Sequence, residues 1–393
     1  MVWMTLNTNS STKYVLESTD FQQLIDVLVG IGYRVIGPTL DHNAVIYDDI
    51  TAVTDLPIGW TDEQDAATYR LNRRSDEAFF GYVIAPQAWK KFLYPSQVRL
   101  WQAALSNGSF EILLDSEKPE PMAFIGVRSC ELHAIAIQDR VFIEGEYVDP
   151  TYHAHRENLF MVAVNCGQAG GTCFCTSVNT GPKVEAGYDL ALTEVIDHET
   201  HYFVVEVGTE RGQHVLEQLP VRNADKREAK LPKTITDQAA HQIKRHLNTD
   251  GIKELLYTNS ENPRWDEIAT RCLTCANCTM VCPTCFCTTV EDVTDLTGRQ
   301  AERVRKWDSC FTMDFSYIHG GSVRYTSKSR YRQWMTHKLA TWIDQFGTLG
   351  CVGCGRCITW CPVGIDITAE LEAIRQTKAK GETIKEGSDE NIG

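Results

Sequence analysis

Two runs of cysteines constrain this chain more than any other feature of its sequence. Each run has the order C-x-x-C-x-x-C-x-x-x-C-P, and the cysteines are Cys272, Cys275, Cys278 and Cys282 in the first and Cys351, Cys354, Cys357 and Cys361 in the second. This spacing is typical of cubane iron–sulfur sites, in which each iron of the cube takes one thiolate. We therefore predict two [4Fe–4S] clusters.

The fourth cysteine of each run is expected to bind the cluster of the other run, because it follows a longer spacer and precedes a proline. The first predicted ligand set is then Cys272, Cys275, Cys278 and Cys361, and the second is Cys351, Cys354, Cys357 and Cys282. Tetrahedral zinc is the alternative, since it also binds four thiolates in paired C-x-x-C units. A zinc site does not require the fourth cysteine followed by proline, and still less two copies of this order, so the spacing favours clusters.

Composition narrows the class of protein. A chain of 393 residues with 43% apolar content can form two or three globular domains. Its 15 cysteines are spaced as metal ligands, which indicates a reduced compartment. Residues 1–13 lack the pattern of an export signal, and no apolar run approaches the roughly 20 residues that span a bilayer. We expect a cytoplasmic protein that binds no membrane, and the net charge of −14 argues against nucleic acid as a partner.

The N-terminal part of the chain is predicted to be mixed α/β. Apolar residues at helical spacing predict an amphipathic helix over 19–29, and the glycines that follow it end a helix rather than form a dinucleotide loop. Short apolar runs predict strands at 35–38, 44–47 and 80–84.

Two longer apolar runs, 123–127 and 159–164, each lead to a cysteine, and a helix is predicted between them over 131–140. Such runs are typical of buried parallel strands, which deliver the residues at their carboxyl ends to one edge of a sheet. A glycine-rich C-x-C segment follows the second run. The geometry predicts a third iron–sulfur site formed by Cys130, Cys166, Cys173 and Cys175. The alternative is four buried, unpaired thiols.

Residues 172–178 (TCFCTSV) are nearly repeated at 284–290 (TCFCTTV), directly after the first cysteine run. Three cysteines outside the predicted sets remain: Cys285, Cys287 and Cys310. They either share a cluster with the third set, form a site with a ligand other than cysteine, or stay free. The sequence leaves these alternatives open.

The C-terminal part is predicted to be helical. Residues 222–233 are a charged segment with a proline, typical of a linker. Beyond it, most of the segment between the two cysteine runs has helical periodicity, with one apolar face over 331–346 that ends at Gly347. We predict an α+β chain with an α/β domain at 1–120, an α/β domain with the third site at 121–233, and an α-helical ferredoxin domain with two clusters at 234–393.

The sequence also resembles a known family, the beta subunits of cytoplasmic NAD(P)-linked nickel–iron hydrogenases called sulfhydrogenases. The resemblance rests on GVRSCELH at 126–133, GTCFC at 171–175, GYDLALT at 187–193, SRYRQWMTHK at 329–338 and the second cysteine run at 349–366. The related iron–sulfur subunit of anaerobic sulfite reductase is similar in many of the same segments.

The resemblance implies an electron-transfer subunit without a substrate site of its own. Its partners would be a flavin subunit that binds NAD(P) and the small and large hydrogenase subunits, or a reductase catalytic subunit. Single electrons would hop between clusters whose potentials depend on burial, hydrogen bonds to sulfur and nearby charge. Gly353 and Gly355 would let backbone N–H groups approach sulfur, and Arg356 would stabilise a reduced cluster or form a surface ion pair. A scaffold protein with purely structural clusters is the remaining alternative.

Overall fold

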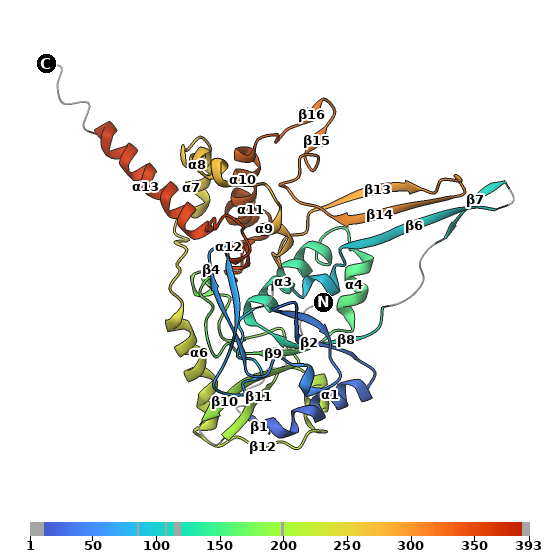
Figure 1. Cartoon of the computed structure of the whole chain (residues 1–393), viewed down its shortest axis with the longest axis vertical. Helices are drawn as coiled ribbons and strands as arrows, with labels where there is room; N and C mark the ends of the chain where they lie inside the picture. Colours follow the sequence, from blue (N-terminus) through green and yellow to red (C-terminus); the bar gives the residue numbers. More distant parts are fainter. Residues whose placement is uncertain (1–11, 85, 107, 114–118, 198–199, 387–393) are drawn as a thin grey trace.

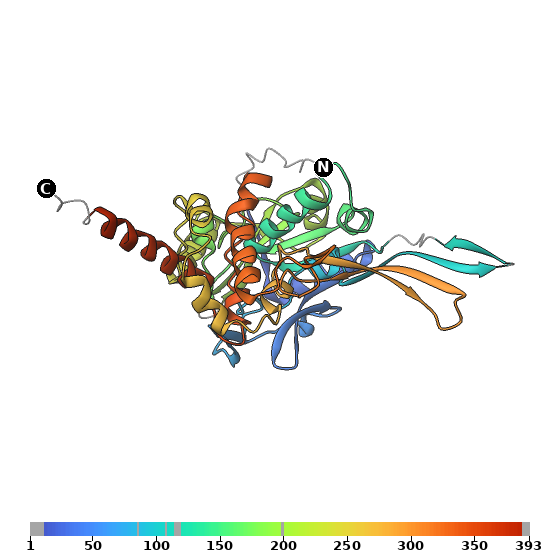
Figure 2. The same ribbon diagram turned by 90° about the horizontal axis from the view of Figure 1, so that it is seen from above.

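The computed structural model describes residues 12–84, 86–106, 108–113, 119–197 and 200–386. Most of the segment 1–13, which lacks the pattern of an export signal, therefore lies outside the described residues. A large sheet with its helices forms one end of the molecule, short helices form the other end, and a β arm projects to the side (Figure 1). Seen from above, the arm extends well beyond both (Figure 2).

The large sheet has eight strands and a parallel centre. In spatial order they are β12 (Arg222–Asn223), β1 (Tyr14–Glu17), β11 (Thr200–Val207), β10 (Leu190–Asp197), β9 (Phe160–Val164), β8 (Met122–Val127), β2 (Arg34–Asp41) and β3 (Ala44–Asp49). Strands β10, β9, β8 and β2 run parallel to one another, whereas the strands on either side pair antiparallel.

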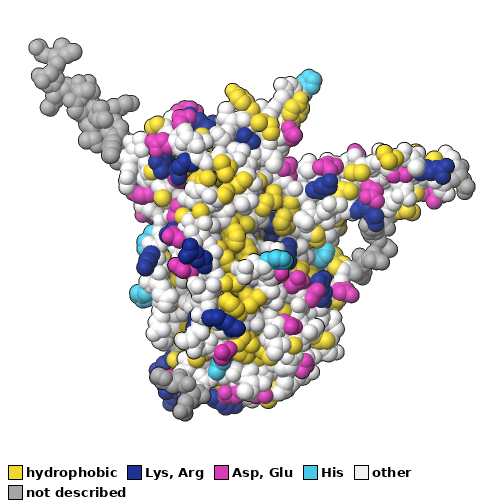
Figure 3. Space-filling model, viewed as in Figure 1, with side chains coloured by type: hydrophobic (Ala, Val, Ile, Leu, Met, Phe, Trp, Pro, Cys, Tyr) yellow, Lys and Arg dark blue, Asp and Glu magenta, His cyan; other side chains and the backbone are white. Residues whose placement is uncertain are grey.

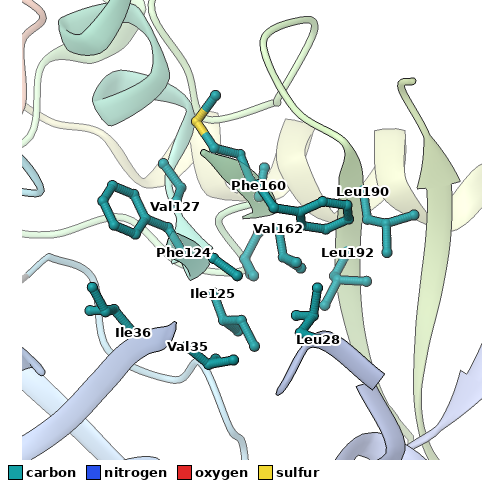
Figure 4. Close-up of a cluster of buried hydrophobic side chains, with 14 of the residues drawn as sticks. Leu28, Val35, Ile36, Phe124, Ile125, Val127, Phe160, Val162, Leu190 and Leu192 are labelled. Carbon is teal, nitrogen blue, oxygen red and sulfur yellow. The ribbon is translucent and has the colours of Figure 1, made fainter. Parts of the chain in front are cut away.

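The centre of the sheet matches its sequence pattern. Every residue of β8 and β9 is buried, as expected for continuous apolar runs covered on both faces. The chain between them forms α3 (Ser129–Phe142) and α4 (Pro150–Glu157). Side chains of Leu28, Ile125, Val162 and Leu192 gather in one cluster, with Leu28 contributed by α1 (Phe21–Gly30) (Figure 4). The predicted helix and the parallel strand pair are thus present.

The strand predicted at 80–84 is wrong. This segment is irregular although it is buried. The guanidinium group of Arg128, also buried, donates hydrogen bonds to the carbonyl oxygens of Phe80 (2.8 Å), Tyr82 (2.7 Å) and Asn165 (3.0 Å). A side chain therefore satisfies carbonyl groups that a neighbouring strand would otherwise pair.

The arm is a four-stranded antiparallel sheet in the order β13 (Thr288–Thr294), β14 (Gln300–Trp307), β6 (Gln97–Ser106) and β7 (Ser109–Leu113). Apolar side chains lie exposed among charged ones along it (Figure 3). The prediction that most of the segment between the two cysteine runs is helical is wrong here, because β13 and β14 form a hairpin. Four of the first six residues of β13 (TTVEDV) are β-branched, and this strand propensity, with a turn at Gly298 (φ 66°), prevails over the helical period.

Short helices and hairpins complete the chain. The helices are α2 (Lys90–Leu93), α5 (Glu210–Leu216), α6 (Leu231–Gln242), α7 (Ile252–Thr258), α8 (Arg264–Arg271), α9 (Asn277–Met280), α10 (Ser327–Thr336), α11 (Trp342–Phe346), α12 (Arg356–Thr359) and α13 (Ile367–Glu386). A π-helical turn over His337–Thr341 joins α10 to α11. The hairpins are β4 (Trp60–Asp65) with β5 (Thr68–Arg73), and β15 (Tyr317–Ile318) with β16 (Gly321–Ser322). The helices α7, α8, α10 and α13 pack around a second apolar core.

The division into domains at 1–120, 121–233 and 234–393 remains a prediction. The large sheet takes β1, β2 and β3 from the first of these segments and its other strands from the second, and the arm joins strands of the first and third. Among the described residues, no helix combines the length and the apolar content needed to cross a bilayer.

Candidate metal centre

The first predicted cysteine set surrounds a hollow in the helical end of the molecule. Cys272 follows α8, Cys278 lies on α9, Cys275 lies in the turn between them, and Cys361 follows α12. All four, with Cys357 of the second set, line one hollow of about 30 Å³ together with aromatic side chains of the second apolar core.

The turn that carries Cys275 is strained. Thr274 and Ala276, its neighbours, both have left-handed backbone conformations, with φ of 50° and 68°. For residues with a side chain this conformation costs on the order of 1–2 kcal/mol each. Strain of this kind persists where the surrounding structure fixes it, and here it allows three closely spaced cysteines to face one hollow.

The second predicted set is also drawn together. Burial raises the pKa of the Cys357 thiol well above its usual value, and the nearby Cys351, Cys354 and Cys282 raise it further. Cys282 comes from the first cysteine run, and Cys278 of that run also acts on Cys357, so the two runs lie side by side here. The crossed ligand sets remain a prediction. Thiols buried in this way stay protonated without a metal and lose their protons when a metal binds them. Four such thiols are the donors that the iron atoms of a cluster would take.

The third predicted set lies beside the second. Burial raises the pKa of Cys130, and Cys354, Cys175 and Cys166 are among the groups that add to the shift. Cys130, Cys173, Cys175 and Cys354 share one buried cluster. Cys354 of the second set therefore packs with three members of the third set, so the second and third sets adjoin each other.

Two glycines make the contact between the second and third groups possible. A Cβ atom on Gly353 (φ 62°) would lie 2.7 Å from the backbone of Cys175, and one on Gly355 (φ 77°) would overlap the carbonyl of Thr172. The Phe174 N–H donates a 2.8 Å hydrogen bond to the Gly353 carbonyl oxygen. The two cysteine loops therefore touch backbone to backbone. The N–H of Gly353 also lies 3.5 Å from the Cys351 sulfur, in line with the role expected for it.

A buried ion pair joins the same two loops. Arg356, at the start of α12, lies 2.6 Å from the carboxylate of Glu131 in α3, and each side chain is only 1% exposed. The alternative of a surface ion pair for Arg356 is therefore wrong. Glu131 follows Cys130 directly, so this contact links a residue beside the third group to one beside the second.

Lys338 is a functional candidate that the sequence pattern hides. It lies on the π-helical turn and is 5% exposed. Its ammonium group is 3.2 Å from the Cys282 sulfur, 3.0 Å from the Thr284 hydroxyl and 3.1 Å from the Gly350 carbonyl oxygen. Burial lowers the pKa of Lys338, but nearby thiolates, Cys282 first among them, raise it well above its usual value. The available signal was a lysine on an otherwise apolar helical face.

The three remaining cysteines lie close to the first two groups but outside them. The Cys285 thiol is hydrogen-bonded to Cys282, and the Cys287 thiol is hydrogen-bonded to Cys310. Within the described residues, no group of three or more His, Cys, Asp or Glu side chains is arranged to hold a single metal ion.

Comparison with known proteins agrees with this geometry. Residues 271–365 match the family model of the 4Fe-4S dicluster domain, and this segment contains both cysteine runs. The C-terminal part carries a 4Fe-4S dicluster domain. The predicted order of a mixed α/β part followed by an iron–sulfur domain is thus confirmed.

The likeness to sulfhydrogenases extends along almost the whole chain. The sequence is 28% identical over 368 residues to sulfhydrogenase 2 subunit beta of Pyrococcus furiosus, which covers 93% of this chain and 99% of that protein. The resemblance inferred from short segments is confirmed. No solved structure matches the chain significantly.

The glycine contact gives a testable expectation. Replacing Gly355 by alanine should reduce the free energy of unfolding by about 3 kcal/mol or more, because the new Cβ atom meets a backbone carbonyl in addition to the left-handed conformation. Gly347→Ala is the matched control, since its φ is 69° but no atom lies within 4 Å of the added Cβ, and it should cost about 1 kcal/mol. Urea unfolding of both variants measures the difference, and equal losses would contradict the proposed close contact.

Proposed function

We propose that this chain is an electron-transfer subunit in the cytoplasm that relays single electrons through three [4Fe–4S] clusters. Its partners would be a flavin subunit that binds NAD(P) and the small and large subunits of a nickel–iron hydrogenase. The observation that carries the proposal is the crossed arrangement of the two cysteine runs, which is the ligand pattern of paired cubane clusters. The dicluster domain and the likeness to a sulfhydrogenase beta subunit support it.

The proposed ligands follow the three groups. The first cluster would bind Cys272, Cys275, Cys278 and Cys361, the second Cys282, Cys351, Cys354 and Cys357, and the third Cys130, Cys166, Cys173 and Cys175. Cys275 is exposed, whereas most of the third set is buried. The first cluster would then lie nearest the surface and exchange electrons with one partner, and the groups behind it would continue the path.

Buried cations support a redox role for these groups. Arg330 acts on Cys272 of the first group, Lys338 and Arg356 act on Cys282 and Cys354 of the second, and Arg128 acts on Cys166 of the third. A cluster held by four thiolates carries net negative charge, which grows when it takes up an electron. Positive charge held in a poorly solvated interior offsets this growth and raises the reduction potential.

Purification of the native complex tests the proposed partners. We expect nickel, flavin and a hydrogenase large subunit to co-elute with the chain, because a one-electron relay functions between a donor and an acceptor. Siroheme without nickel would replace the hydrogenase by an anaerobic sulfite reductase, the second family with similar segments. Clusters that stay silent in electron paramagnetic resonance across the accessible potentials would instead indicate a scaffold.

The crossed ligand assignment is tested by single substitutions in the holoprotein. The intact chain should hold about twelve irons, and loss of one cluster should leave about eight. Cys282→Ala should change the spectrum of the same cluster as Cys351→Ala, because both residues belong to the second set. Cys278→Ala is the matched control from the same run and should affect the other cluster. If Cys282→Ala and Cys278→Ala alter one and the same cluster, the crossing is wrong.

Lys338 should set the potential of the second cluster. Lys338→Met removes a buried positive charge next to Cys282, so the reduction potential of that cluster should fall by on the order of tens of millivolts, where about 59 mV is a tenfold change in a one-electron equilibrium. Lys306→Met is the control, because Lys306 is partly exposed and paired with Glu291 on the arm. Redox titration followed by electron paramagnetic resonance measures both. A shift of equal size in the two variants would contradict the assignment.

A further inference from the structure

Two of the cysteines outside the proposed clusters form a thiol pair. Cys287 lies at the start of the arm, one residue before β13, and Cys310 lies shortly after β14. Their thiols are hydrogen-bonded to each other, and the N–H of Asp308 donates a 2.8 Å hydrogen bond to the Cys287 carbonyl oxygen. The base of the β13–β14 hairpin therefore holds the two sulfurs together.

The pair opens onto a cavity. Both cysteines are partly exposed and line a hollow of about 670 Å³. Phe286, Phe315 and Phe346 form apolar parts of its wall, and Arg324 adds a positive charge. Burial and the nearby Lys338 lower the pKa of His337, so its imidazole lines the cavity as a neutral hydrogen-bonding group. None of the twelve proposed cluster ligands lines this cavity. Its size suits a small molecule, and the charge of Arg324 suits one with an acidic substituent.

The arrangement differs from that of the proposed cluster ligands. Cys285, the third cysteine of this region, is hydrogen-bonded to Cys282 of the second set and does not line the cavity. Two thiols in contact remain, which is too few for a cubane cluster and is the arrangement from which a disulfide forms on loss of two electrons.

The surroundings favour a nucleophilic sulfur at Cys287. The hydrogen bond from Cys310 lowers the pKa of Cys287 to about 7, against the opposing effect of burial, and the ammonium groups of Lys338 and Lys90 contribute in the same direction. The same contact raises the pKa of Cys310. Near neutral pH about half of the Cys287 thiol is therefore present as a thiolate, while Cys310 keeps its proton.

We propose that Cys287 and Cys310 are a redox-active dithiol that reduces the disulfide bond of a small acidic molecule in this cavity. The Cys287 thiolate attacks one sulfur of the substrate RSSR, forms a mixed disulfide and releases RS⁻. Cys310 then gives up its proton, attacks the Cys287 sulfur and releases the second RS⁻, which leaves a Cys287–Cys310 disulfide. Two electrons and one proton restore the thiolate–thiol pair. With protonation of both products, the sum is RSSR + 2e⁻ + 2H⁺ → 2RSH.

The source of the two electrons is reduced iron–sulfur clusters, and this part of the proposal rests on the proposed function. Cys310 is close enough to Cys278 of the first set to be influenced by its charge, and Lys338, which contacts the Cys282 sulfur of the second set, also acts on Cys287. A pair that lies between two one-electron donors can collect the two electrons that disulfide reduction needs. This position would let the chain join one-electron relay to two-electron chemistry.

Oxidised glutathione, a small disulfide with carboxylate groups, is the probe for this pair. The anaerobic holoprotein is reduced with dithionite, desalted and mixed with the probe, and free thiols are then blocked in acid for mass spectrometry. We expect release of glutathione thiol and a peptide cross-linked through Cys287 and Cys310. Cys310→Ser should trap glutathione on Cys287, and Cys287→Ser should give neither product. Cys285→Ser is the matched control and should behave as the parent, with iron content verifying that the clusters are intact in every variant.

The proposal would be overturned if Cys287→Ser still reduced glutathione, or if the adduct formed on Cys285 in place of Cys287. It would also be overturned by an iron content of about sixteen that falls in Cys287→Ser, because that result would mean a fourth cluster. Reduction with a phosphine separates this proposal from the electron relay, provided that the protein is desalted before the probe is added, because a phosphine in solution reduces oxidised glutathione by itself. If the phosphine-reduced, desalted protein releases glutathione thiol and forms the Cys287–Cys310 disulfide, but reduced clusters do not restore the dithiol afterwards, the dithiol is supported and the relay as its electron source is wrong.

Discussion

The backbone contact between the C-x-C loop at 172–175 and the loop that begins the second cysteine run organises the functional part of this molecule. One loop belongs to the sheet end and the other to the helical end, and glycine at positions 353 and 355 removes the side chains that would keep them apart. The buried pair of Arg356 and Glu131 lies across the same junction. Because both ends meet here, cysteines that are far apart in the sequence become neighbours, and the first and third groups take their places on either side of the second.

Burying this much sulfur has an electrostatic cost that the fold offsets locally. Each cysteine group has a buried or nearly buried cation at its edge, and these cations come from different elements: a loop after β8, α10, the π-helical turn and α12. Buried cations of this kind are expensive without partners. Their partners are carbonyl oxygens, one carboxylate and the thiols, so the same contacts that stabilise the protein also set the charge around the candidate clusters.

The sequence predicted the strongly periodic features well. Continuous apolar runs identified β8 and β9 as parallel neighbours, and helical spacing identified α1. The cysteine order identified two runs that lie side by side in the structure, and the crossed ligand sets remain a prediction. It failed where long-range contacts decide local structure. The 80–84 segment has strand propensity but is bound by Arg128, and the β13–β14 hairpin depends on pairing with β6. The contacts of Lys338 could not be deduced either: its spacing places it on the apolar face of 331–346, but only the fold shows that Cys282 lies beside its ammonium group.

The arm has a consequence for how the chain is made. Strand β6 pairs with β7 on one side and with β14 on the other, where Gln97 lies opposite Lys306. The β6–β7 hairpin is synthesised about 200 residues before β14. The β14-facing edge of β6 therefore stays unpaired until most of the chain has left the ribosome. Exposed edges of this kind invite pairing with other chains. When β14 arrives, it closes that edge and at the same moment carries the following segment, with Cys310, to the base of the arm. Protection from aggregation during synthesis and assembly of the thiol pair are therefore one event in the maturation of this protein.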